Sequence, residues 1–236
     1  MTIQTSFDGP RICFLGDSFT QGLGDPEFRG WVGRVLQAAA PAATAFNLGV
    51  RRDTSAQVRR RWRSEVEART LPGADNRLVL SVGANDAMPA DGAPGEGGAP
   101  RVAHEDTLAN LAALLGEARA LGLGALVVGP PPVGCGGAVH RERLRELVPA
   151  MAETCAALGV PFVDVTEALA ADPVWTAEAA AGDGAHPGAG GYGRLAELVL
   201  AGGFREWVGA ERSGSEGSGS ESSGADLTLS ALQGES

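Results

Sequence analysis

The chain has 236 residues, of which 44% are hydrophobic, 20% charged and 5% aromatic, and its formal net charge is −10. This composition excludes a collagen, a coiled coil and a wholly disordered chain, and no apolar run reaches the roughly 18 to 20 residues that a membrane span requires. Nucleic acids and anionic membranes are not expected as partners, because binding them needs clustered positive charge. The length favours one domain with an appendage.

The first ten residues and the cysteines indicate the compartment. Residues 1–10 contain no basic residue and no apolar core of the length that a secretion signal needs. Cys13, Cys135 and Cys155 are too few, and odd in number, for a disulfide framework, and none lies in a CxxC spacing. Both observations predict a cytoplasmic protein.

Five short apolar runs alternate with segments of helical period, which is typical of a parallel sheet covered by helices on both faces. The expected strands are Arg11–Leu15, Thr44–Leu48, Leu78–Val82, Ala125–Val128 and Val160–Val165. The expected helices include about Gly30–Ala40, Glu105–Leu121 and Gly190–Leu200. The pattern therefore predicts an α/β fold with three layers, helix, sheet and helix.

Two further helices have clear internal signals. Thr54 and Gln57 form a capping box, and an apolar residue then recurs at every fourth position along one face, at Val58, Trp62 and Val66. The other helix carries an apolar stripe at spacings of four and three, formed by Leu144, Val148, Met151, Cys155 and Leu158. This stripe predicts that Cys155 is a thiol of the core.

Two segments fall outside this plan. Residues Ala87–Arg101 are crowded with Gly, Pro, Ala and Asp, which is typical either of a lid or binding loop or of a flexible insertion. From about Ser213 to Gly224 the chain is almost wholly Ser, Gly and Glu, and three leucines follow, Leu227, Leu229 and Leu232. We predict a domain over residues 1–210 and a disordered tail over 211–236, where a docking peptide is the functional alternative.

Polar residues follow three of the predicted strands. The first strand leads into Gly16-Asp17-Ser18, the second ends in Asn47-Leu48-Gly49, and the third leads into Gly83-Ala84-Asn85-Asp86. Parallel sheets bind ligands at the carboxyl ends of their strands. Each residue also has a structural alternative, since Ser18 is in the usual position of a helix cap and Asn85 could be an ordinary turn residue.

A fourth segment supplies the groups that a serine nucleophile needs. Asp183 precedes His186 by three residues, and Pro187 keeps His186 out of a helix. A serine hydroxyl reacts only when a base takes its proton, and an imidazole does so well when an acceptor holds its other nitrogen. Asp183 is a candidate for that acceptor. The N–H groups of Ser18 and Gly49 and the amide of Asn85 are candidate donors to an oxyanion.

In order along the chain, Gly16-Asp17-Ser18, Gly49, Gly83-x-Asn85-Asp86 and Asp183-x-x-His186 resemble the sequence blocks of the SGNH hydrolases, also called GDSL esterases and lipases. The resemblance spans about residues 10–200, and Phe19 stands where the eponymous motif has Leu. It implies a flavodoxin-like sheet of five parallel strands and hydrolysis of esters or thioesters, with no metal and no cofactor.

The same resemblance implies a role for each matching residue. Ser18 would be the nucleophile, His186 the base and Asp183 its orienter, while Ser18, Gly49 and Asn85 would form the oxyanion hole. Gly129-Pro130-Pro131-Pro132 resembles a family segment that shapes the wall of the site. A small-molecule ester is the expected substrate. A carbohydrate deacetylase or an acyltransferase with the same triad, and a catalytically silent binding module, are the alternatives.

The remaining polar and apolar residues leave alternatives open. His104 and His140 are expected at the surface, Cys13 within a strand and Cys135 near the site. Arg51 and Arg52 could meet an anionic group of the substrate or form a solvated pair at a turn. Six apolar residues near the motifs could line an acyl pocket or belong to the core, namely Phe19, Leu23, Phe28, Trp31, Met88 and Val133.

Overall fold

The computed structural model describes residues 9–90 and 98–210 and contains one sheet of five parallel strands. The strands are β1 (Arg11–Gly16), β2 (Thr44–Gly49), β3 (Asn76–Ser81), β4 (Gly124–Val128) and β5 (Phe162–Val163), in the order β2-β1-β3-β4-β5. This strand order is that of flavodoxin-like folds. The predicted α/β class and the flavodoxin-like arrangement are confirmed.

The first four strands begin and end within two residues of their predicted bounds, but β5 is much shorter than the predicted Val160–Val165. Pro161 directly precedes β5 and accepts a hydrogen bond from the N–H of Val127 through its carbonyl. Because a proline has no N–H, it cannot donate to the ladder in return. The pairing of this edge strand is therefore confined to two residues.

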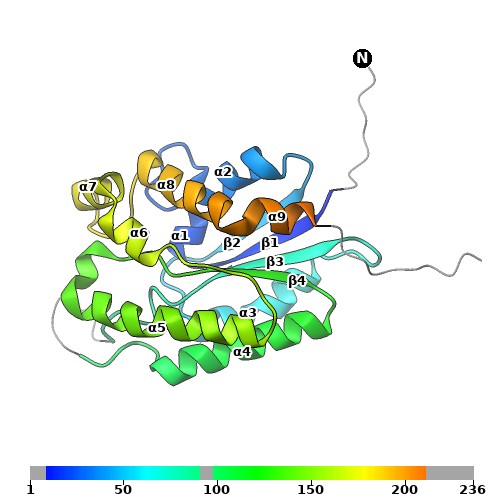
Figure 1. Cartoon of the computed structure of the whole chain (residues 1–236), viewed down its shortest axis with the longest axis horizontal. Coiled ribbons are helices and arrows are strands. Elements are labelled where there is room, and N and C mark those ends of the chain that lie inside the picture. Colours follow the sequence, from blue (N-terminus) through cyan, green and yellow to red (C-terminus); the bar gives the residue numbers. More distant parts are fainter. Residues whose placement is uncertain (1–8, 91–97, 211–236) are drawn as a thin grey trace, which may run out of the picture.

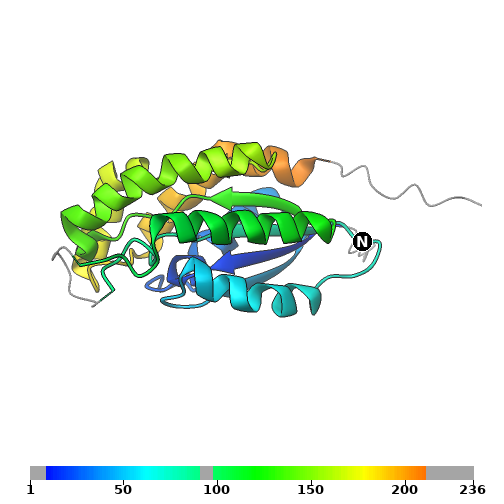
Figure 2. The same ribbon diagram turned by 90° about the horizontal axis from the view of Figure 1, so that it is seen from below.

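Helices cover both faces of the sheet (Figures 1 and 2). One face carries α2 (Gly30–Ala39), α8 (Ala189–Val199) and α9 (Arg205–Gly209), and the other carries α3 (Ser55–Glu67), α4 (His104–Ala120) and α5 (Gly137–Ala157). Alternate residues of β1 enter opposite cores. Ile12 and Phe14 pack toward α2 and α8, and Cys13 and Leu15 pack toward α3, α4 and α5. Burial on both faces explains why the strands read as continuous apolar runs.

The helix signals in the sequence correspond to packed helices. The Gln57 side chain accepts a hydrogen bond from the N–H of Thr54 at 2.9 Å, as the capping box predicts, and Val58, Trp62 and Val66 are buried. In α5, Leu144, Val148, Met151 and Cys155 are buried. Burial raises the pKa of the Cys155 thiol to about 12, as it does for the Cys13 thiol in β1, to about 11. Both thiols belong to the core.

Several short helical segments have no counterpart in the sequence prediction. They are α1 (Ser18–Gln21), η1 (Gly134–Gly136), α6 (Thr166–Ala171), α7 (Pro173–Ala181), η2 (Leu200–Phe204) and α9 (Arg205–Gly209). Periodicity needs a window of about 11 to 18 residues, so it does not detect elements of this length. For α7 a local signal exists, because Asp172 accepts hydrogen bonds from the N–H groups of Val174 and Trp175, and Pro173 occupies the first helical position.

The two irregular segments are described only in part. At the base of the predicted loop, Pro89 and Pro100 form an antiparallel bridge, and the N–H of Arg101 donates to the carbonyl of Met88 at 2.9 Å. Residues 91–97 and the predicted tail 211–236 lie outside the described residues, so the lid and the tail stay predictions. Within residues 9–90 and 98–210, no helix is long and apolar enough to cross a membrane.

Candidate active site

The site lies where the direction of strand addition reverses. Strand β1 pairs with β2 on one side and with β3 on the other, and Gly16 at its end is level with both Gly49 and Ser81. Loops that leave β1 and β3 diverge from such a point and open a crevice, which is where open α/β sheets bind ligands. Ser18 follows β1 and Asn85 follows β3. The topology therefore brings these two predicted residues to the same crevice.

Ser18 is the first residue of α1, and the residue before it caps that helix. The Asp17 carboxylate accepts a hydrogen bond from the N–H of Phe19 at 2.9 Å. The capping role that the sequence left open for Ser18 thus belongs to Asp17. Ser18 is 4% exposed, and its Oγ lies 2.7 Å from Nε2 of His186.

The segment between α7 and α8 holds His186 against Ser18. Nδ1 of His186 lies 2.7 Å from Oδ2 of Asp183, and Oδ1 of Asp183 accepts hydrogen bonds from the N–H groups of Ala185 and His186, each at 2.9 Å. The two side chains thus belong to one tight turn. The Phe19 ring packs against the imidazole, with ring centroids 5.0 Å apart.

The ionisation of Asp183 decides the tautomer of His186. Partial burial acts to raise the pKa of Asp183, but the hydrogen bonds from His186 and Ala185 outweigh it and lower the pKa to about 2. The carboxylate is therefore ionised at neutral pH and accepts a hydrogen bond from a protonated Nδ1. This leaves the lone pair of Nε2 free to accept the hydroxyl proton of Ser18.

Both ends of the Asn85 amide are held. Its Nδ2 donates to Oδ2 of Asp17 at 3.0 Å, and its Oδ1 accepts from Nη1 of Arg101 at 3.0 Å. The next residue, Asp86, is fully buried and accepts a hydrogen bond from the N–H of Ser55, which fixes the backbone after β3 against α3. Since an amide nitrogen carries two N–H groups, one of them makes no hydrogen bond with the described residues.

Gly49 does not join this cluster. Its N–H donates to Oδ1 of Asn47 at 3.0 Å, and it is absent from the residues that line the pocket around Ser18. A Cβ at this position would lie 2.2 Å from the backbone nitrogen of Gln21, so packing against α1 explains the glycine. The role of Gly49 in an oxyanion hole stays a prediction that this geometry does not support.

A pocket of about 240 Å³ surrounds Ser18, Asn85 and His186. Of the six apolar residues that could line an acyl pocket or belong to the core, three line this pocket, namely Phe19, Met88 and Val133. The other three do not line this pocket. Leu23 lines an adjoining depression beside His186, Trp31 is buried in the core, and Phe28 is 94% exposed.

Three arginines, Arg51, Arg52 and Arg101, complete the wall of this pocket. The sequence singled out Arg51 and Arg52 but not Arg101. Arg101 lies at the end of a long loop of Gly, Pro and Ala residues, where no periodicity or motif marks a position. The hydrogen bond from its N–H to the carbonyl of Met88, across the base of that loop, places Arg101 beside Asn85.

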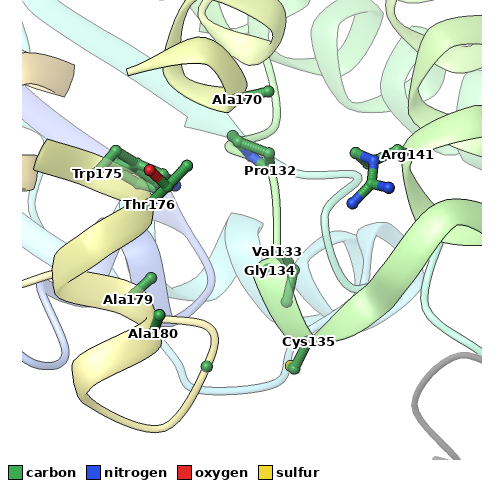
Figure 3. Close-up of a pocket in the computed structure, with 11 residues that line it drawn as sticks. Pro132, Val133, Gly134, Cys135, Arg141, Ala170, Trp175, Thr176, Ala179 and Ala180 are labelled. Carbon is green, nitrogen blue, oxygen red and sulfur yellow. The ribbon is translucent and has the colours of Figure 1, made fainter. Parts of the chain in front are cut away.

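A second cavity, of about 370 Å³, adjoins the first (Figure 3). It lies between α7, which contributes Trp175 and Ala179, and the segment that follows the predicted Gly129–Pro132 wall. Val133 and Cys135 line both cavities. The mostly apolar second cavity therefore borders the pocket that contains Ser18.

The other two histidines lie away from the pocket that contains Ser18. The prediction that His140 is a surface residue is wrong, because its side chain is fully buried in α5, where Nε2 lies 3.0 Å from the carbonyl oxygen of Ala84. Burial lowers the pKa of His140. His104 is partly exposed at the start of α4. Among the described residues, no group of three or more His, Cys, Asp or Glu side chains could hold a metal ion.

Solved structures show that known enzymes share this fold. An acetylxylan esterase from Geobacillus stearothermophilus is 23% identical with a TM-score of 0.64, and the match covers 87% of this chain and 99% of that one. A lipase/acylhydrolase from Enterococcus faecalis is 24% identical with a TM-score of 0.61, covering 81% and 94%. TesA is 21% identical with a TM-score of 0.63, covering 82% and 98%.

The family of the chain follows from its sequence. No curated protein matches it. The model of the GDSL-like lipase/acylhydrolase family matches residues 14–194, which is most of the chain and includes Ser18, Asn85, Asp183 and His186. The chain therefore belongs to the GDSL-like lipase/acylhydrolase family and is a hydrolase that acts on ester bonds.

Proposed function

We propose that the protein is a serine esterase that works through an acyl-enzyme on Ser18, with His186 as general base and Asp183 as the residue that orients it. The observation that supports this assignment is the unbroken chain of contacts from Ser18 Oγ to His186 Nε2, and from His186 Nδ1 to Asp183 Oδ2, each 2.7 Å long. Such a chain is what an activated serine nucleophile requires.

The reaction proceeds in two steps of the same kind. Ser18 Oγ attacks the ester carbonyl carbon while His186 Nε2 takes the hydroxyl proton, and the imidazolium then gives this proton to the departing alkoxide or thiolate. In the second step, His186 takes a proton from the water that attacks the acyl carbonyl. The imidazolium then gives this proton to Ser18 Oγ as the bond between Oγ and the acyl carbon breaks, which releases the acid and restores the serine hydroxyl. Asp183 stabilises the imidazolium in both steps, and its lowered pKa keeps it an ionised carboxylate.

The negative charge of each tetrahedral intermediate needs donors beside Ser18. The second N–H of Asn85 is one candidate, because the first is held by Asp17 and the amide orientation is fixed by Arg101. The backbone N–H of Ser18 is another, since no backbone or side-chain acceptor in the described part of the chain takes it. The apolar cavity beside Val133 and Cys135 would hold the hydrocarbon part of the ester.

A fluorophosphonate probe tests the nucleophile directly, because it labels only an activated serine. We expect labelling of the wild type and of Ser64→Ala, a control at an exposed serine of α3, and none of Ser18→Ala. Release of nitrophenol from acetyl, butyryl and octanoyl esters should be lost in parallel. Labelling that persists in Ser18→Ala, or a folded wild type that neither labels nor turns over any ester, would contradict the proposal.

A further inference from the structure

The pocket around Ser18 concentrates positive charge in a chain whose net charge is −10. Arg51, Arg52 and Arg101 line the pocket together with Ser18 and His186. The only carboxylate among the lining residues is Asp183, which is already paired with His186. The charge at the mouth of the site is thus opposite to that of the protein as a whole.

None of these three arginines forms an ion pair with a carboxylate of the described residues. Elsewhere among the described residues, Arg34, Arg61 and Arg77 each have a carboxylate partner, at 2.5, 2.7 and 2.6 Å. Arg51 and Arg52 make no side-chain hydrogen bond in the part of the chain that is described, and Arg101 makes one, to Asn85. A guanidinium has five N–H donors, so most of the donors of this group are available to a ligand.

Arg52 has an unfavourable backbone conformation, and Arg101 has surroundings that disfavour its charge. Arg52 has a backbone φ of 72°, in the left-handed region where glycine or asparagine is the usual residue. Arg101 is partly buried, and this burial, together with the nearby charge of Arg52, lowers its pKa. Two guanidinium groups that repel each other at the edge of a pocket gain the most when an anion lies between them.

We propose that the ester accepted by this site carries an anionic group, a carboxylate or a phosphate, close to its scissile carbonyl, and that Arg51, Arg52 and Arg101 bind that group. This inference rests on the proposed function, since it assumes that the ester carbonyl lies at Ser18. Arg101 would act in two ways, by binding the anion and by holding the Asn85 amide. Arg51 and Arg52, which form no hydrogen bond or ion pair with the described Asn85, Ser18, His186 or Asp183, would act on binding alone.

Matched pairs of esters test the proposal. The mono-4-nitrophenyl ester of adipic acid is compared with 4-nitrophenyl hexanoate, 4-acetoxybenzoate with its methyl ester, and 4-acetoxyphenyl phosphate with 4-methoxyphenyl acetate. The pairs place the anion in the acyl part or in the alcohol part, and they separate carboxylate from phosphate. After division by the rate of hydroxide-catalysed hydrolysis, we expect kcat/KM of at least one anionic ester to exceed that of its neutral partner by about tenfold or more, as a charge-assisted hydrogen bond provides.

Variants and salt identify the arginines as the cause. Arg51→Gln and Arg52→Gly, the latter favoured by the local φ, should each reduce the anionic preference several-fold, whereas Arg60→Gln, an exposed arginine of α3 outside the pocket, should leave the preference as it is. Raising the ionic strength from about 0.05 M to about 0.5 M should lower kcat/KM for the anionic ester more than for the neutral one. Equal turnover within all three pairs, with no effect of Arg52→Gly, would overturn the proposal.

Binding gives a readout that does not depend on turnover. Ser18→Ala should bind the preferred anionic ester more tightly than the neutral partner in a calorimetric titration, and Arg52→Gly in the same background should remove the difference. If the fluorophosphonate labels Ser18 but no anionic ester is preferred or bound more tightly, this inference fails and the esterase assignment stands. If labelling and turnover are absent while the anionic ester still binds through Arg52, the esterase assignment fails and the anion-binding role of the arginines stands.

Discussion

Oδ2 of Asp17 lies 3.0 Å from Nδ2 of Asn85 and so ties the end of β1 to the end of β3 across the crevice. Arg101 occupies the opposite end of the same amide, on Oδ1. A donor at one end and an acceptor at the other leave only one orientation of the amide. The direction of the second N–H of Asn85 is therefore fixed before any substrate arrives, as a preorganised donor to an oxyanion would require.

Removal of this amide should slow the chemical step more than binding. For Asn85→Ala we expect kcat to fall on the order of 10²-fold, with a much smaller change in KM, because the interaction strengthens only as the oxyanion forms. Steady-state kinetics with a nitrophenyl ester measure both constants. A kcat close to that of the wild type would remove Asn85 from this role.

Replacement of Asp183 by its amide should disturb the tautomer of His186. In Asp183→Asn the carbonyl oxygen can still accept the N–H groups of Ala185 and His186, so the turn should persist. An amide NH₂ facing Nδ1 favours the tautomer with the proton on Nε2, which cannot accept from Ser18. We expect kcat to fall on the order of 10³- to 10⁴-fold, as for the corresponding change in a serine protease.

Circular dichroism should show a folded Asp183→Asn protein. A loss of activity smaller than tenfold would indicate that Asp183 does not orient the base.

Gly24 packs closely against the turn that carries Asp183 and His186. Gly24 has a φ of +93°, and a Cβ there would lie 2.7 Å from the carbonyl oxygen of Pro187 and 3.2 Å from Cβ of His186. Gly24→Ala should therefore displace the turn and lower kcat by about tenfold or more, since small misplacements of catalytic groups are costly. The change is followed by nitrophenyl ester kinetics.

Gly73→Ala provides a matched control for Gly24→Ala. Gly73 also has a positive φ, +78°, but no atom lies within 4 Å of the added Cβ. Both variants should lose about 1 kcal/mol of stability from backbone strain, and only Gly24→Ala should lose activity. Equal kcat values for the two variants would show that contact with Pro187 and His186 does not matter.

Asp17 should make stability depend on pH. Burial raises its pKa to about 7, against the hydrogen bond from Phe19, so the folded state keeps a proton that the unfolded state releases near its ordinary value of 3.8. Stability contributed by the protonated form is present below about pH 4 and is lost as the pH rises to about 7, by a few kcal/mol at most in order of magnitude. Asp17→Asn should remove this loss.

Urea unfolding at several pH values between about 5 and 8 measures the effect as a difference between wild type and Asp17→Asn. His140 contributes in the opposite direction, because its lowered pKa favours folding as the pH rises through about 6.5. This contribution is common to both proteins and cancels in the difference. Parallel pH profiles of the two proteins would show that Asp17 does not carry the proton.

The sequence predicted the sheet and the triad geometry for different physical reasons. Strands buried on both faces, such as β1 and β3, are continuous apolar runs, which can be recognised in the sequence without knowing which strands pair with them. Ser18 was found because it directly follows the first strand, and His186 because Asp183 precedes it by three residues and Pro187 keeps it out of a helix. The 2.7 Å contact between them confirms that the two segments meet, while their catalytic roles stay proposals.

What the sequence did not reveal depends on contacts between distant segments. Arg101 is positioned by the hydrogen bond from its N–H to the carbonyl of Met88, across the base of a loop. His140 is buried on the side of α5 that faces the carbonyl of Ala84. Gly49 carried the right residue type at a strand end, but its N–H is taken by a neighbour two residues away, Asn47. Neither the spacing of residues nor their type shows that the Asn47 side chain takes this N–H in the folded protein.

The turn from Asp183 to His186 contains the base and its orienter together, and the backbone N–H groups of Ala185 and His186 bind the same carboxylate that holds the imidazole. The nucleophile, in contrast, belongs to a different part of the chain. A shift of this turn away from α1 would break the contact between Ser18 and His186 and the packing of the Phe19 ring on the imidazole, and it would carry the acid and the imidazole away as an intact pair. An inactive arrangement of this kind would keep the Asp183–His186 pair assembled, and return of the turn to α1 would restore the hydrogen bond with Ser18.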